Sequence, residues 1–423
     1  MRFQTNTVLI CLIINLIDGF DVLAISFAAP QIAEDWSLEP TAIGFLISVG
    51  LAGMVFASIF IAGIADYLGR YKTILLCLGV ITLGMVGSAT AESTSTLAAW
   101  RFLVGLGVGT ILPSLNTLVA EFSPAHRREL SVALMQAGYP AGAIVGGIVA
   151  VIVSVELGWR GIFWVGASLS GAVLLVAWRL LPESAEFLLS RRPAGALARI
   201  NALYRKQGVS EIGELPPVST SQQKGLGYRG LMQPEVGLRV ALLSLAFFFV
   251  MASFYFVAGW TPKLLVDAGL ALREGLSGAV ILHVGGILGG LILGACAPRF
   301  GAMRLTAGYM IMCIPMMLLF ASTTDLLPML LTAFVMGYFL VGSMMGLYVL
   351  TPALFAAETR ATATGVALGL GRFGAILAPL LTGFLLAADW TPADLYRLFA
   401  APMFISATMA LLLWRISSPR LAN

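Results

Sequence analysis

The sequence predicts an all-α polytopic membrane protein with twelve transmembrane helices. Three observations lead to this fold class. Of the 423 residues, 59% are hydrophobic and 11% are charged, with a mean hydropathy of +0.94, whereas soluble globular proteins carry about 25% charged residues. Apolar runs of about 20 residues recur along the chain, which is the length that a helix needs to cross a bilayer. Lys and Arg gather in alternate connecting segments.

The apolar runs are predicted to be helices, because backbone that faces lipid must satisfy its hydrogen bonds within its own segment. They are also longer than the strands of a membrane barrel. We do not expect a cleaved signal peptide, because two aspartates follow the first apolar stretch and the apolar pattern then resumes. The predicted spans are 7–29, 41–65, 72–91, 97–120, 131–154, 160–181, 238–260, 275–297, 303–321, 327–354, 363–387 and 394–415.

A polar segment, residues 182–237, interrupts this series after the sixth span. It is rich in Arg, Lys, Glu and Pro, and we expect a short surface helix at 194–206. The segment divides the chain into an N-terminal six-helix bundle at 1–181 and a C-terminal six-helix bundle at 238–423.

The distribution of basic residues predicts the orientation. With the N-terminus in the cytoplasm, inside segments hold 19 Lys and Arg residues and outside segments hold four. Cytoplasmic loops carry such an excess in membrane proteins. Both termini are therefore predicted to be cytoplasmic, in an inner membrane crossed many times.

The two halves share a weak internal sequence repeat. The segment "GIADYLGRYK" (63–72) joins the second and third spans, and "GACAPRFGAMR" (294–304) joins the eighth and ninth. The first has the form G-x-x-D-x-x-G-R-x-K, which resembles the signature loop of the major facilitator superfamily. Further stretches resemble the same superfamily: "RFLVGLGVGTILPSLNTLVAEF" (101–122), "GYPAGAIVGG" (138–147) and "LPESAEFL" (181–188).

Two more stretches resemble the aromatic acid:proton symporters within that superfamily. They are "DGFD" (18–21) and "ATATGVALGLGRFGAILAPLLTG" (361–383). The resemblance implies two six-helix bundles around a central cavity, and proton-coupled uptake of a small aromatic carboxylate by alternating access. It implies a bacterial cytoplasmic membrane, no cofactor or metal, no nucleic acid and a functional monomer.

Other functions remain open at this point. They include uptake of muconate, niacin or another organic acid, and antiport of a drug or metabolite against protons. A non-transporting membrane receptor is less well supported, because the segment 182–237 is short and polar for a signalling domain. An enzyme is not expected, because the sequence shows no catalytic cluster or metal-ligand spacing.

Asp18 and Asp21 are the most unusual residues of the first span. On a helix they lie one turn apart on one face, near mid-depth, where ionisable groups are costly and mark ion or proton paths. Gly19 between them permits close approach of a neighbouring backbone. We predict that at least one of them takes up and releases the coupled proton. The alternative is that both pair with buried arginines.

Three further polar residues of the spans are candidates for substrate binding. Arg372 lies near mid-depth of the eleventh span, and its planar guanidinium suits bidentate capture of a carboxylate. His283, in the eighth span, is a candidate to hydrogen-bond substrate or to carry a proton. Arg101 either extends toward the outer interface or pairs with Asp21.

Aromatic residues with polar tips are candidates to line a cavity for a flat ring. They are Tyr255, Trp260, Tyr338 and Tyr348. Packing against lipid or other helices is the alternative function of each.

The loop between the second and third spans is predicted to act in gating. Asp66 lies at a helix end, where it can meet a charged partner, Gly69 allows a tight turn, and Arg70 follows. Glu121 and Arg360 are assigned to gating as well. Tyr67 replaces a basic residue of the family pattern and Pro298 replaces the acid of the second half, so the second gate is expected to be weak.

Glycine patterns in the spans are assigned to helix packing. "GLGRFG" (369–374) fits a dinucleotide-binding pattern, but that pattern requires a preceding strand, and this one lies within a predicted span. Small residues let membrane helices approach closely. The same assignment applies to Gly105, Gly107, Gly109, Gly285, Gly286, Gly289 and Gly290.

Overall fold

The computed structural model describes residues 2–124, 127–207, 209–215, 231–323, 325–355 and 357–421. Eleven helices in these ranges are long and apolar enough to cross a membrane. One of them, Leu130–Leu180, has 51 residues and contains the predicted spans 131–154 and 160–181. The eleven helices therefore account for the twelve predicted crossings, and the predicted all-α fold class is confirmed.

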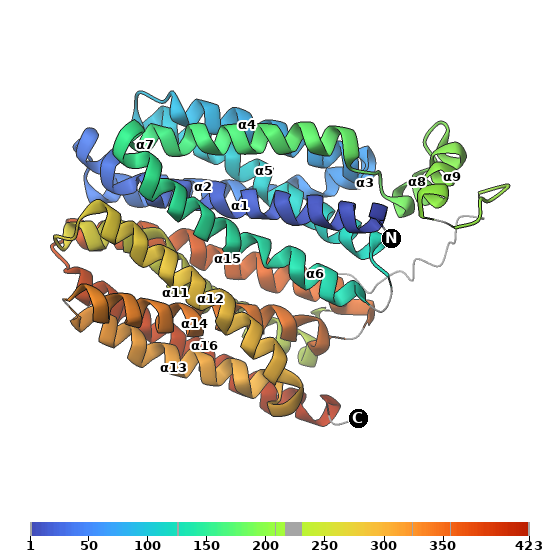
Figure 1. The fold of residues 1–423 in the computed structure, drawn as a ribbon. Coiled ribbons are helices and arrows are strands. Elements are labelled where there is room, and N and C mark those ends of the chain that lie inside the picture. Colours follow the sequence, from blue (N-terminus) through green and yellow to red (C-terminus); the bar gives the residue numbers. More distant parts are fainter. Residues whose placement is uncertain are drawn as a thin grey trace. The chain divides into compact units, whose positions relative to one another are not determined.

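The described part of the N-terminal half contains six helices of nine residues or more and two short helical segments, and Figure 1 shows their arrangement. They are α1 (Arg2–Asp35), α2 (Pro40–Phe60), η1 (Ala62–Ile64), α3 (Ala65–Leu68), α4 (Arg70–Ala89), α5 (Thr94–Phe122), α6 (Arg128–Gln136) and α7 (Gly138–Leu180). The assigned helix α7 is broken at Gly158, whose φ of 62° and ψ of −170° are not helical. This break is the connection predicted between the fifth and sixth spans.

The linker and the C-terminal half follow in the same pattern. Their elements are α8 (Ala185–Arg191), α9 (Ala196–Gln207), α11 (Pro234–Asp267), α12 (Leu272–Phe300), α13 (Ala302–Ser322), α14 (Leu326–Leu350), η3 (Thr351–Leu354), α15 (Ala357–Ala387) and α16 (Pro392–Leu421). The surface helix predicted at 194–206 is confirmed as α9. The helix α8 was not predicted, and linker residues 216–230 lie outside the described ranges.

The chain divides into two compact units that do not coincide with its two halves. The first unit comprises Met1–Ala24, Gly50–Ala143 and Arg160–Ser221, and the second comprises Ile25–Val49, Ile144–Trp159 and Gln222–Asn423. The dividing points fall inside α1 and α2 and within α7. Helices α1 and α2 therefore contribute one part to each unit, whereas α7 contributes two parts to the first unit and one part to the second.

In the first unit, the linker helices pack onto an apolar core formed with the spans. Buried members of this core include Ile14 of α1, Cys77 of α4 and Leu115 of α5, together with Leu188 of α8 and Ile200 of α9. Figure 1 shows α8 and α9 beyond the end of the second part of α7. This core fixes the linker helices against the ends of α1, α4 and α5.

In the second unit, small residues bring the helices into close contact. A side chain on Gly285 or Gly289 of α12 would collide with main-chain carbonyls of α14, and one on Gly337 of α14 would collide with a carbonyl of α12. The predicted packing role of these α12 glycines is confirmed. In the first unit, Gly105 and Gly109 of α5 meet main-chain carbonyls of α2 in the same way.

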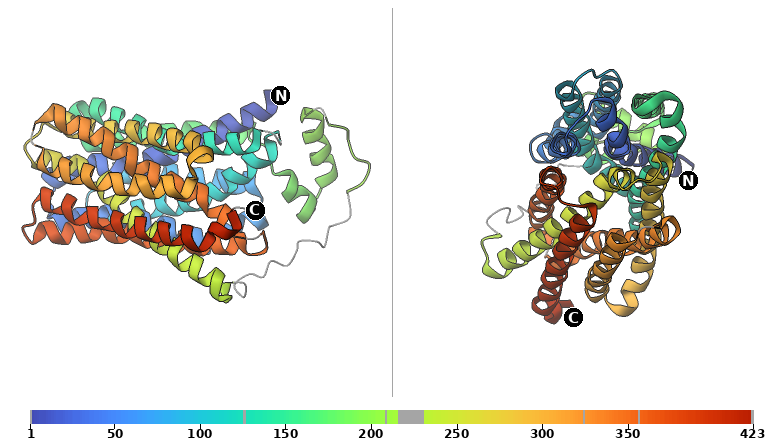
Figure 2. Two further views of the ribbon diagram at one scale, coloured as in Figure 1. Left: turned by 90° about the horizontal axis from the view of Figure 1, so that it is seen from below. Right: turned by 90° about the vertical axis from the view of Figure 1, so that its left-hand side faces the viewer.

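Hydrogen bonds between α11 and α16 set the register of that pair. Ser253 Oγ donates to the carbonyl of Phe399 at 2.8 Å, and Ser406 Oγ donates to the carbonyl of Ala246 at 2.9 Å. Higher numbers on one helix thus face lower numbers on the other, so the two helices are antiparallel. Figure 2 shows the long helices of this unit running along one another.

Candidate functional site

The acid pair of α1 is buried in the first unit. Asp18 is 1% exposed and Asp21 is 0% exposed. None of their four carboxyl oxygens has a hydrogen-bond partner among the described residues, and the two carboxyls are close enough to interact by charge. Buried polar groups are normally hydrogen-bonded. This pair is therefore an exception that its structural surroundings do not account for.

Glycines hold neighbouring helices tightly against the acid pair. A side chain on Gly19 would collide with the main-chain carbonyl of Tyr139 in α7, and one on Gly142 of α7 would collide with the carbonyl of Leu16. The close backbone approach expected at Gly19 is thus confirmed. On the far side of the α7 break, a Cβ on Gly166 would lie 3.0 Å from a carboxyl oxygen of Asp21.

Arg101 of α5 is placed beside Asp21. Its Nη2 donates to the main-chain carbonyl of Asp21 at 2.6 Å, and its Nη1 lies 3.4 Å from Sδ of Met85. The guanidinium is also 5.7 Å from the ring centroid of Phe163. It is 2% exposed, and of the two predicted alternatives the structure favours proximity to Asp21, through the main-chain carbonyl of that residue.

The main-chain bond leaves the Asp21 carboxylate unbound while its charge still interacts with Arg101. A carboxylate in a low-dielectric interior feels a nearby guanidinium strongly. Either carboxyl can gain a proton without losing a protein hydrogen bond, whereas loss of the proton buries a charge that Arg101 alone offsets among the described residues.

Three predicted binding residues lie on α11, α14 and α15 of the second unit, near enough for their charges to influence one another. Tyr348 of α14 interacts electrostatically with Arg372 of α15 and with Tyr255 of α11. Its ring centroid lies 5.3 Å from that of Phe247, at an interplanar angle of 53°. Tyr348 is 39% exposed and Tyr255 is 9% exposed, while Arg372 is partly buried. One cation and several aromatic faces thus come from three helices.

The glycines of "GLGRFG" explain how Arg372 comes so close to α11. A side chain on Gly371 would collide with Cβ of Phe247, and one on Gly374 would collide with the carbonyl of Phe248. The segment lies inside α15, and the described residues before this helix contain no strand. The packing assignment of these two glycines is confirmed.

The other predicted binding residues lie in different surroundings. His283 of α12 is 2% exposed, its two ring nitrogens have no partner among the described residues, and its ring is 6.4 Å from that of Phe254. Trp260 is 0% exposed and donates from Nε1 to the carbonyl of Pro379 at 3.2 Å. Tyr338 accepts a hydrogen bond from the hydroxyl of Tyr309 at 2.8 Å. The polar tips of Trp260 and Tyr338 are therefore engaged within the protein.

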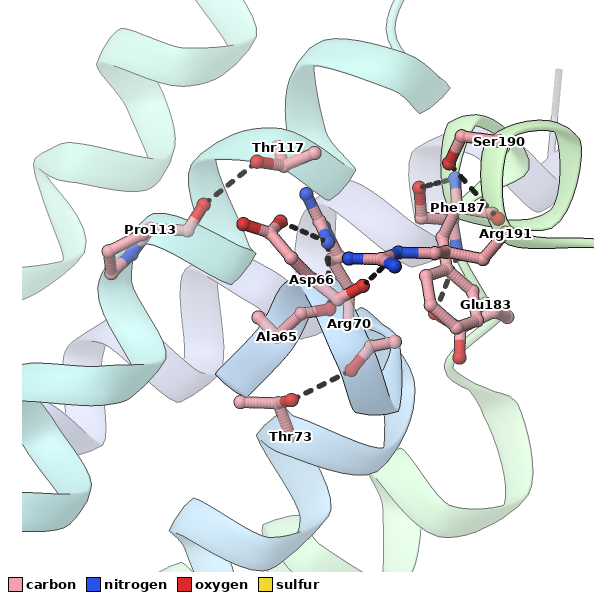
Figure 3. A network of polar contacts seen from close by, with 12 residues as sticks. Ala65, Asp66, Arg70, Thr73, Pro113, Thr117, Glu183, Phe187, Ser190 and Arg191 are labelled. Atoms are coloured by element: carbon pink, nitrogen blue, oxygen red, sulfur yellow. Dashed lines mark hydrogen bonds and ion pairs between the residues drawn. The ribbon is translucent and has the colours of Figure 1, made fainter. Parts of the chain in front are cut away.

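The predicted gating loop forms a local network (Figure 3). Asp66 and Arg70 form an ion pair at 2.8 Å, and Arg70 also donates to the carbonyl of Ala65 at 2.7 Å. Arg191 of α8 donates to the carbonyl of Asp66 at 2.9 Å and stacks over Tyr67 at 4.7 Å. The charged partner of Asp66 in this structure thus lies four residues away in its own loop.

Gly69 is required at the turn between α3 and α4. Its φ is 91°, in the left-handed region that disfavours residues with a side chain. An added Cβ would also collide with a carboxyl oxygen of Glu183 and lie 2.9 Å from the ring of Phe187. Conformation and space therefore both exclude a larger residue.

Glu183 is a residue of this network to which the sequence analysis assigned no function. It is 7% exposed, and its Oε1 accepts from the main-chain nitrogens of Tyr71 at 3.0 Å and Ser184 at 2.9 Å. These nitrogens lie at the starts of α4 and α8, where helices carry unsatisfied N–H groups. One carboxylate thus joins two helix N-termini. The segment "LPESAEFL" carried this signal, because an acid and a serine precede a helix.

Glu121 of α5 binds the same N-terminus of α8. Its Oε1 accepts from the hydroxyl of Ser184 at 2.7 Å, and its Oε2 accepts from the main-chain nitrogen of Ala185 at 2.9 Å. Ser184 in turn caps α8 by accepting from the nitrogen of Phe187 at 3.0 Å. Arg360 lies in α15, and its side chain is outside the described set.

The equivalent loop of the second half has different contacts. Gly301 has a φ of 84°, but a Cβ there would meet no atom within 4 Å. Arg299 lies over the ring of Phe300 at 5.6 Å, and Arg304 lies over that of Trp414 at 4.4 Å. Among the described residues, no ion pair is found in this loop that corresponds to Asp66 with Arg70.

Curated relatives match nearly the whole chain. It is 31% identical over 411 residues to the gallate transporter of Pseudomonas putida, covering 96% of this chain and 90% of that protein. It is 29% identical over 418 residues to the 4-hydroxybenzoate transporter PcaK of Acinetobacter baylyi, covering 96% and 90%. A niacin transporter, NiaP, of the same organism is 27% identical and is covered to 91%.

Solved structures agree on the fold. The inward-open xylose transporter XylE from E. coli is 17% identical with a TM-score of 0.78, over 98% of this chain and 96% of that chain. The D-xylose-proton symporter matches with a TM-score of 0.74 at 17% identity, over 97% of each chain. These relatives and fold neighbours are transporters and not enzymes. Residues 11–351 match the sequence profile described as Major Facilitator Superfamily, and the chain belongs to this superfamily of membrane transporters.

Proposed function

We propose that this transporter imports a small aromatic carboxylate together with protons. Transport would proceed by alternating access in a bacterial cytoplasmic membrane, with both termini in the cytoplasm and a monomer as the functional unit. The relatives named as gallate and 4-hydroxybenzoate transporters support the substrate class. The relative named as a D-xylose-proton symporter shares the fold and agrees with proton coupling.

The group of Tyr255, Tyr348 and Arg372 is the observation that carries the substrate assignment. An aromatic carboxylate needs a cation for its charge and apolar faces for its ring. Arg372 offers a planar fork that matches a carboxylate, and the exposed ring of Tyr348, which packs on the buried Phe247, offers a face for offset or edge contacts. The phenolic groups of Tyr255 and Tyr348 add donors and acceptors for ring substituents.

The acid pair supplies the site for the coupled proton. Asp18 and Asp21 are buried, lack protein donors and lie close to the charge of Arg101. A transporter couples two species when binding of one changes the free energy of binding or movement of the other. Protonation of either acid changes the charge buried in α1 and would thereby alter the equilibrium between access states.

Uptake into proteoliposomes tests this function. Vesicles with an alkaline interior and an acidic exterior should accumulate labelled 4-hydroxybenzoate or gallate beyond the level of protein-free vesicles, which report passive entry of the neutral acid. Addition of a protonophore should abolish the accumulation that exceeds the level of protein-free vesicles. Niacin, muconate and a cationic drug complete the panel.

The outcomes separate the alternatives. Accumulation of niacin or muconate, without accumulation of 4-hydroxybenzoate or gallate, would show that the proposed substrate class is wrong. Accumulation under the inverted pH gradient would favour antiport. Specific binding without any transport would favour a receptor.

A further inference from the structure

A buried arginine, Arg239, lies in the second unit near the start of α11, which begins at Pro234. Arg239 is 6% exposed, and its enclosed Nε has no hydrogen-bond partner among the described residues. A buried charge is normally paired, because desolvation without compensation is costly. Glu235, one turn earlier on α11, is exposed and forms no described ion pair with it.

Two further partnerless groups share this region. The hydroxyl of Ser417 in α16 is buried, with the residue 3% exposed, and the hydroxyl of Thr364 in α15 is also enclosed. Neither has a hydrogen-bond partner among the described residues. Donors that remain unsatisfied on three different helices are unusual in a folded protein.

The register of the helices places these groups at one depth. The pairs Ser253–Phe399 and Ala246–Ser406 align Ser417 with the first turn of α11. The contact of Gly371 with Phe247 aligns Thr364 with the turn that contains Arg239. Because helical side chains tilt toward the N-terminus of their own helix, the guanidinium of Arg239 extends toward the level of Ser417.

The facing directions also agree. Successive residues of a helix are rotated by about 100° around its axis. Around the axis of α11, Arg239 therefore points between Ser253, which bonds α16, and Phe247, which contacts α15. Ser417 shares the α11-facing side of α16 with Ser406. Thr364 shares the α11-facing side of α15 with Gly371.

We propose that Arg239, Ser417 and Thr364 form a binding site for the phosphate oxyanion of an anionic phospholipid headgroup. One guanidinium and two hydroxyls supply donors that a phosphate accepts, and a charged partner would satisfy the buried cation. Basic pockets between membrane helices on the cytoplasmic side bind such headgroups. This end of α11 adjoins the basic linker and is the predicted cytoplasmic end; Figure 2 shows the start of α11 and the end of α16 toward the same end.

The surroundings favour a lipid over a water-soluble phosphate. Leu238 is 52% exposed, Leu412 is 39% exposed and Ile416 is 37% exposed, so apolar side chains that contact hydrocarbon lie next to the polar group. A ligand with acyl chains satisfies both surfaces at once, because the headgroup reaches the donors while the chains cover the apolar rim.

Native mass spectrometry of the detergent-purified, delipidated full-length transporter tests the site. Phosphatidylglycerol should bind more tightly than phosphatidylcholine. Arg239→Gln should weaken phosphatidylglycerol binding at least about tenfold, and Ser417→Ala roughly threefold. Arg304→Gln is the matched control, because it removes an exposed arginine from the same end, and its effect should stay under about twofold. If Arg239→Gln does not elute as a monodisperse peak, Ser417→Ala and Arg239→Lys replace it as the test variants.

Inorganic phosphate distinguishes the source of the oxyanion. Phosphate that displaces phosphatidylglycerol, and that stabilises wild type but not Arg239→Gln against heating, would assign the same site to the free anion. Equal affinity for the two lipids would overturn the proposal. Equal losses in Arg239→Gln and Arg304→Gln would do so too, because binding would then follow surface charge in general.

Discussion

Replacement of Glu183 should destabilise the end of the first unit that carries α8, by an amount that can be calculated from the contacts of Glu183. The carboxylate is 7% exposed and accepts two main-chain hydrogen bonds, from Tyr71 and Ser184. Hydrogen bonds to a charged group contribute about 1.5–3 kcal/mol each. Glu183→Ala removes both hydrogen bonds and leaves two N–H groups without this acceptor. The free energy of unfolding should therefore fall by about 3–6 kcal/mol. Glu183→Gln retains an oxygen acceptor but loses the charge, so roughly half of that loss is expected.

Thermal unfolding of the purified protein provides the measurement. At about 1 °C per kcal/mol for a chain of this length, Glu183→Ala should lower Tm by about 3–7 °C. Hydrogen exchange should accelerate in peptides that cover the starts of α4 and α8. Glu186→Ala is the control, because this neighbour is exposed in the first turn of α8 and should cost about 0.5 kcal/mol. If the Tm values of the two alanine variants agree, the carboxylate does not hold the two helix ends together.

The remaining predictions concern transport. The variants Asp18→Asn and Asp21→Asn keep the shape of the side chain but cannot ionise. One of them should lose pH-driven accumulation of substrate, which for one coupled proton reaches about tenfold per pH unit. The same variant should still exchange substrate across the vesicle membrane. Full accumulation in both would exclude the pair. Arg372→Lys should raise the half-saturating substrate concentration about tenfold, or ~1.4 kcal/mol, whereas Arg397→Lys on the exposed start of α16 should have no effect; unchanged values for Arg372→Lys would remove the anchor. Asp66→Ala should slow transport and leave equilibrium binding of the acid intact, and a parallel loss of both in well-folded protein would contradict a gating function.

Much of the fold followed from short-range properties of the sequence. Hydrophobic length gave the spans, because a helix must cover the hydrocarbon thickness with apolar side chains. The glycines of α12 and α15 were recognisable as packing residues, because a missing side chain permits close backbone contact in any partner arrangement. The break at Gly158 fell where two spans were expected to separate. Helix α8 was missed, since seven residues carry too little periodicity to recognise.

The sequence by itself determined that acids, arginines and aromatic residues lie inside a membrane protein, but not how they are arranged. Only the tertiary structure decided that Arg101 binds the main chain of Asp21 and leaves its carboxylate unbound. It likewise placed Tyr348 near Arg372, engaged Tyr338 with Tyr309, and joined two helix starts through Glu183. The physical reason is that hydropathy and helical period fix the depth and the face of a residue within its own helix. Its hydrogen-bond partners depend on the rotation and register of helices far apart in the chain, which packing of all their side chains decides together.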